Sequence, residues 1–135
     1  MAASKDRDTK RRLGADVADP VAANTVIYAG TLYALNASGD AVPASAVAAQ
    51  RTRGVCQETV VNTGGAAGAQ TVIGRRDGFY NFKNSASGDL ITRADIGNAC
   101  YVVDDETVAK TSNSNARPVA GIVRDVNAAG VWIEL

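Results

Sequence analysis

The side chains that most enzymes use for catalysis near neutral pH are sparse in this chain. The sequence contains no histidine, which removes the commonest general base and the commonest transition-metal ligand. The most acidic stretch is Asp104-Asp105-Glu106, but it lacks the alternating ligand spacing of a calcium loop, and neighbouring residues of a strand point to opposite faces. We therefore expect a solvated hairpin turn there, no metal or cofactor, and no enzymatic activity.

Two further motifs could bind phosphate groups. The stretch Gly64-Gly65-Ala66-Ala67-Gly68 is rich in glycine, yet it lacks the residue order of a phosphate-binding loop, so it predicts a flexible hairpin tip. Arg51-Thr52-Arg53 and Arg75-Arg76 could line a nucleic-acid surface. The 14 basic residues are balanced by 14 acidic ones, however, and phosphate binding depends on an excess of cations. We expect no nucleic-acid partner.

The cysteines and the single tryptophan indicate packing rather than chemistry. Cys56 and Cys100 show no CxxC spacing, and a chain folded in a reducing compartment rarely joins such a pair, so we expect buried free thiols. In a regular C-terminal strand, Trp132 would lie opposite the face of Val131 and Ile133. It either caps a second core face or anchors an oligomer interface.

Composition and spacing favour strands for the elements that carry these residues. The 135 residues include 32 β-branched Val, Ile and Thr, whereas the strong helix formers Leu, Glu, Lys, Gln and Met supply 16. Short runs separated by Gly, Asn and Asp turns recur from residue 25 onward, which is typical of an all-β fold, a small antiparallel β-sandwich or β-barrel. Residues 92–97 predict one helical turn with Thr92 as its N-cap, and residues 43–50 could be a helical turn or a loop.

We expect four hairpins in this body. They are residues 25–28 with 31–35 and 41–42, residues 53–62 with 70–76, residues 100–103 with 107–109, and residues 118–126 with 131–135. Residues 79–83 form a further strand with Tyr80 and Phe82 on one face. Of the hydrophobic residues 25 are alanine, so the core should be thin and a partner or oligomer should add stability.

Residues 1–19 differ from the rest and predict an extended, flexible N-terminal arm ahead of a β-rich domain of residues 20–135. Residues 1–12 carry five basic and two acidic side chains, a charge of +3, so the other 123 residues carry −3. With few sizeable apolar groups, the arm cannot fold alone; it is either disordered or ordered by contact with another surface. The candidate contact residues are Lys5, Arg7, Lys10, Arg11 and Arg12.

Targeting signals for a membrane or for secretion are not visible in the sequence. No apolar run approaches the roughly 20 residues that span a bilayer. The first residues, MAASKDRDTKRR, lack the apolar segment of a secretory signal. We therefore expect synthesis in the cytoplasm and no membrane partner.

Two C-terminal stretches resemble the decoration, or cement, proteins of tailed-phage heads. They are residues 97–109 (GNACYVVDDETVA) and residues 120–135 (AGIVRDVNAAGVWIEL). Gly30-Thr31-Leu32, Arg53-Gly54-Val55 and Asp77-Gly78-Phe79 fit the same ordered pattern. The resemblance covers roughly residues 25–135, and the basic arm is not part of it.

The resemblance implies a β-rich domain on the outside of an icosahedral shell, commonly trimeric, that reinforces contacts between major capsid protein subunits. It implies no catalysis. The expected partners are the major capsid protein and further copies of this chain in a homotrimer. The expected location is the capsid exterior of the virion, after synthesis in the host bacterial cytoplasm. Two alternatives stay open: another head or tail component, such as a head fibre base, and a small β-barrel enzyme or ligand-binding domain.

Overall fold

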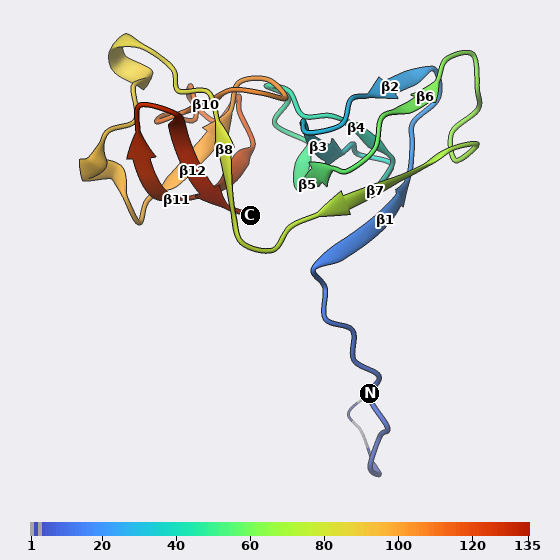
Figure 1. Ribbon diagram of the computed structural model, residues 1–135. Coiled ribbons are helices and arrows are strands. Elements are labelled where there is room, and N and C mark those ends of the chain that lie inside the picture. Colours follow the sequence, from blue (N-terminus) through green and yellow to red (C-terminus); the bar gives the residue numbers. More distant parts are fainter. Residues whose placement is uncertain (1, 3) are drawn as a thin grey trace.

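Antiparallel sheets make up almost all of the regular structure (Figure 1). A computed structural model describes residue 2 and residues 4–135. The first sheet, of order β1-β7-β5-β3-β4, consists of β1 (Asp16–Pro20), β7 (Thr71–Arg75), β5 (Arg51–Cys56), β3 (Leu32–Leu35) and β4 (Ala41–Pro43). The second, of order β10-β9-β11-β12-β8, consists of β10 (Val108–Ala109), β9 (Ala99–Val102), β11 (Val119–Asn127), β12 (Gly130–Glu134) and β8 (Phe79–Phe82). The predicted all-β class is confirmed.

Three smaller elements complete the fold. The strands β2 (Thr25–Ile27) and β6 (Val60–Asn62) form a two-stranded sheet beside the first large one. Two short 3-10 helices, η1 (Ser87–Asp89) and η2 (Arg93–Asp95), lie between β8 and β9. The helical turn predicted at residues 92–97 is η2, in which the Asp95 carboxylate accepts the backbone N–H of Thr92 at 2.8 Å.

Each large sheet curls until its edge strands touch at one point. Val21, directly after β1, forms a bridge with Ala41 of β4. Lys83, directly after β8, forms a bridge with Thr107, directly before β10. Because a single bridge joins the edges, neither sheet closes into a complete barrel.

Two apolar clusters fill the sheets, and one of them is shared. The smaller cluster lies between the first sheet and β2 of the two-stranded sheet, and it consists of Val21, Ile27, Tyr33, Ala41, Cys56 and Val72. The larger one lies mainly in the second sheet, but Leu32, Ala34 and Val55 of the first sheet and Ala44, directly after β4, belong to it as well. The two halves that Figure 1 shows side by side are therefore packed together through a common core.

Hairpins with short turns were predicted correctly. Of the pairings across longer distances, that of residues 53–62 with 70–76 is present only in part, as β5 with β7. The hairpins β3–β4, β9–β10 and β11–β12 are present. The predicted pairing of residues 25–28 with 31–35 is wrong, because β2 pairs with β6. Residues 53–62 are not one strand: β5 ends at Cys56, whose thiol donates a hydrogen bond to the carbonyl of Glu58, and β6 begins at Val60.

The predicted arm boundary at residue 19 needs correction. Asp16–Pro20 form β1, which pairs along its whole length with β7. This strand is hard to recognise in the sequence because it contains the charged residues Asp16 and Asp19. Both have arginine partners, but only in the folded chain. The segment without regular structure ends at residue 15, and the β-rich body begins at residue 16.

Both cysteines are free and buried, as predicted. Burial raises the pKa of the Cys100 thiol to about 12 and also raises the pKa of Cys56. Because the thiolate is the reactive species, neither side chain should react with Ellman's reagent at pH 8 in the native protein. Both should react within minutes in guanidinium chloride, and a thiol that reacts equally fast in both states would contradict the burial described here.

Candidate functional site

The basic arm projects away from the body (Figure 1). Lys5, Arg7, Lys10, Arg11 and Arg12 are all exposed. Within the described residues the only salt bridge of these five side chains joins Lys10 to Asp8, which is itself part of the arm. Leu13, at the base of the arm, is 89% exposed. The structure thus shows a charged segment whose cations make no ion pair with the described part of the body.

A buried charge anchors the strand that carries the arm. Asp19 lies on β1, and only 9% of its side chain is exposed. It accepts a hydrogen bond from the Tyr33 hydroxyl at 2.8 Å and an ion pair from Arg53 Nε at 2.9 Å. Burial, together with the bond to Asp19, raises the pKa of Tyr33. The network fixes the point from which the arm extends.

Three of the four arginines singled out as a nucleic-acid surface lie around β1, and each of the three has a polar partner there. Arg53 pairs with Asp19 and Arg75 with Asp16. Arg76 donates to the backbone carbonyl of Arg53. Arg51 lies at the other end of β5, apart from these three.

Trp132 lies on the outer face of the second sheet. Val131 and Ile133 on either side of it are buried, which confirms the predicted alternation. Trp132 is half-buried, belongs to neither described core cluster, and donates a hydrogen bond of 3.4 Å to Asn127 Oδ1. Its strand neighbours are Asn81 on β8 and Asp125 on β11. The side chain is thus available at the surface.

The acidic stretch forms the predicted turn between β9 and β10. Asp104 Oδ1 accepts the backbone N–H of Glu106 at 2.9 Å, and Glu106 pairs with Lys83. The backbone carbonyl of Asp105 accepts the N–H of Leu32 in the first sheet at 2.9 Å. Burial and the charge of Asp104 raise the pKa of Asp105. The turn joins the sheets, and no group of three potential metal ligands occurs among the described residues.

The glycine-rich stretch also has a structural role. It connects β6 to β7, which do not pair, so it is not the predicted hairpin tip. Gly64 donates its N–H to Asn24 Oδ1 at 2.9 Å. A Cβ on Gly65 would lie 2.0 Å from Asn62 Oδ1, so only glycine fits against that side chain.

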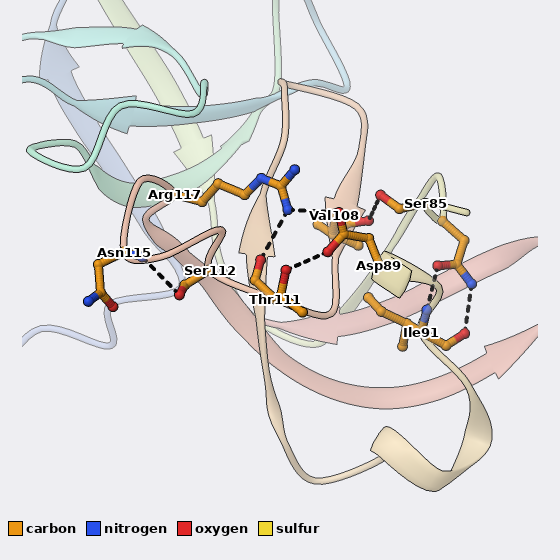
Figure 2. Close-up of polar contacts among 9 residues, drawn as sticks. Ser85, Asp89, Ile91, Val108, Thr111, Ser112, Asn115 and Arg117 are labelled. Carbon is orange, nitrogen blue, oxygen red and sulfur yellow. Dashed lines mark hydrogen bonds and ion pairs between the residues drawn. The ribbon is translucent and has the colours of Figure 1, made fainter. Parts of the chain in front are cut away.

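A polar network that the sequence analysis missed holds the loop of residues 110–118 (Figure 2). Asp89 of η1 accepts hydrogen bonds from the Thr111 hydroxyl and from Arg117, which also donates to the Thr111 carbonyl at 3.1 Å. The bonds from Thr111 and Arg117 lower the pKa of Asp89. Ser112 Oγ accepts the N–H of Asn115 at 3.1 Å. Asp89 lies 22 residues from Thr111 and 28 residues from Arg117, so no local pattern in the sequence indicates these two bonds.

The chain is thus a small all-β protein with an exposed basic arm and an aromatic residue on an outer sheet face. Comparisons with protein-family models, with curated proteins and with solved structures found no match in any of the three. The structure has no helix long and apolar enough to cross a membrane within the residues it describes.

Proposed function

We propose that the chain is a structural protein of a tailed-phage virion that binds the outside of the capsid and reinforces contacts between major capsid protein subunits. The observation that carries the proposal is the arm: five exposed cations on a segment that makes no ion pair with the described body. The resemblance of residues 25–135 to decoration proteins gives the proposal its specific form.

The physics of the arm supports docking on a large surface. Ordering a segment costs about 1–2 kcal/mol of backbone entropy per residue, which the arm's own apolar groups cannot offset. An acidic protein surface would supply the missing free energy through the five cations. A capsid presents such a surface many times, so the arm of every bound copy would have an acidic surface to contact.

Self-association is the second part of the proposal. Trp132 offers a large aromatic ring on an outer sheet face, and such rings are enriched at the centres of interfaces. A homotrimer that contacts three capsid sites at once would bind far more tightly than one subunit, because the second and third contacts are intramolecular.

The test is deletion of residues 1–14, which removes all five cations and leaves β1 intact. Binding to shells assembled from the major capsid protein alone should weaken by about tenfold or more and lose most of its salt dependence. Circular dichroism should show that the β body stays folded. A matched variant with the five basic residues changed to glutamine should behave like the deletion.

Unchanged occupancy with unchanged salt dependence would show that the arm is only a solvated tail. A cryo-electron microscopy map of decorated shells tests the second part. Three chains in contact near Trp132 are expected, whereas isolated copies with Trp132 in solvent would refute the trimer. Localisation to a fibre or to the tail would favour the alternative of another virion component.

A further inference from the structure

An open groove of about 880 Å³ lies where the two large sheets meet. Gln50, Arg51 and Thr52 line it from the first sheet, and Tyr101 and Val119 line it from the second. Thr52 Oγ1 donates a hydrogen bond of 2.6 Å to the backbone carbonyl of Val119, which joins the sheets at this point. The groove is therefore built from residues far apart in the sequence.

The groove is positively charged on a body that is negative overall. Three arginines and one glutamate line it, and Asp89 pairs with one of the arginines, so these side chains carry an excess of one positive charge. Arg124 pairs with Glu134 at 2.7 Å, and Arg117 pairs with Asp89. Arg51 is exposed and makes no side-chain hydrogen bond or ion pair with the part of the chain that is described. At least one guanidinium is thus free to meet an anionic group.

The floor of the groove is apolar. Val119 is 50% exposed, and Ile122 and Tyr101 are half-buried. The last residue of β12 paired with β11 is Glu134, opposite Ile122. Beyond that pair, the start of β11 has no strand partner on the side away from β9, and the Val119 carbonyl on that side accepts the hydrogen bond from Thr52. An extended segment in the groove would therefore contact the exposed side chains of β11 rather than add a strand to the sheet.

One wall of the groove is held in place before anything binds. Ser112, Asn115 and Arg117 line the groove and belong to the network of Figure 2. Asn113, Ser114 and Asn115 all have positive φ, between 50° and 66°. Three consecutive residues in the left-handed region cost free energy that the hydrogen bonds of this loop must offset. The wall is preorganised, which lowers the entropic cost of binding.

We propose that this groove binds an extended, acidic peptide segment with alternating apolar side chains, supplied by the protein on which the chain docks. Carboxylates of the segment would meet Arg51, and apolar side chains would contact Val119 and Ile122. In taking that protein to be the major capsid protein, the inference rests on the proposed function. The chemistry of the groove itself selects the acidic segment, since the chain's own basic arm would be repelled by it.

The experiment uses the full chain labelled with ¹⁵N and a fluorescein-labelled peptide, Gly-Asp-Val-Glu-Val-Asp-Ile-Glu-Gly. Fluorescence anisotropy should show binding that weakens as salt is added. Amide shifts in the NMR spectrum should concentrate at Arg51, Thr52 and Val119. Arg51→Gln should weaken binding by about threefold to tenfold, the range of a charge-assisted hydrogen bond. The matched control Arg93→Gln removes an exposed cation on η2 and should leave binding unchanged.

Several outcomes would overturn the inference. They are no binding at millimolar peptide, equal binding of a peptide with lysine at each acidic position, equal affinity of the Arg51→Gln variant, or amide shifts elsewhere. Concentration-dependent shifts at the groove without peptide would assign it to a second copy instead. If the chain binds shells but does not bind the peptide, only this inference is overturned. If the chain binds the peptide in the groove but does not bind shells, only the proposed function is overturned.

Discussion

Replacing Asp19 with alanine should lower the free energy of unfolding by about 3 kcal/mol, since breaking a buried ion pair leaves its partners uncompensated. The Tyr33 hydroxyl, in a residue that is fully buried, would lose its acceptor, and Arg53 would lose its counter-ion. Arg53 is 32% exposed, so water would satisfy part of its guanidinium and keep the loss near the lower end of the usual range.

Asp16→Ala is the matched control, because Asp16 lies on the same strand and also pairs with an arginine. Both partners of that pair are at least half exposed, so the change should cost less than about 1 kcal/mol. Urea unfolding followed by tryptophan fluorescence measures both. Asp19→Asn keeps an acceptor for the Tyr33 hydroxyl, so its loss of unfolding free energy should lie between those of Asp16→Ala and Asp19→Ala. Equal losses for Asp16 and Asp19 would show that the buried network does not anchor β1.

Gly121→Ala should disrupt the pairing of β11 with β12 and destabilise the protein by about 3 kcal/mol, the upper part of the range for overpacking. A Cβ at this position would lie 2.3 Å from the backbone carbonyl oxygen of Glu134. A backbone atom in a paired strand cannot rotate away as a side chain can, so the strands themselves must separate.

Gly88→Ala gives the comparison, because nothing lies within 4 Å of the added Cβ and the backbone there has no positive φ. Thermal unfolding should place this variant within about 0.5 kcal/mol of the wild type. Trp132, on β12, should also change its emission in Gly121→Ala, because its strand shifts. Wild-type stability and emission in that variant would contradict the close approach of the two strands.

Local signals in the sequence were sufficient for the elements that depend on neighbours in the chain. The turns at Asn36 to Asp40 and at Asp104 to Glu106 have the residue types that close hairpins. The alternation around Trp132 placed its ring on the outer face because side chains alternate along any strand. The capping of η2 by Thr92 follows equally from local residue types.

Features that depend on distant partners gave no such signal. β1 was assigned to the arm because residues 1–19 show no alternation and few sizeable apolar groups. The arginines that pair with Asp19 and Asp16 lie 34 and 59 residues away. β2 and β6 pair across more than 30 residues, although each is followed by an apparently local partner. The groove requires Thr52 and Val119, 67 residues apart, to meet. Such contacts are fixed by tertiary packing rather than by periodicity.

The pairing of β1 with β7 also determines the order in which the chain can acquire structure during synthesis. The partner of β1 is residues 71–75, which are translated more than 50 residues after it. Until then its edge and the basic arm ahead of it are solvated and available to other molecules. The segment proposed to hold the capsid is thus translated before the strand that secures β1, so β1 and the basic arm stay without their partner strand until residues 71–75 have emerged.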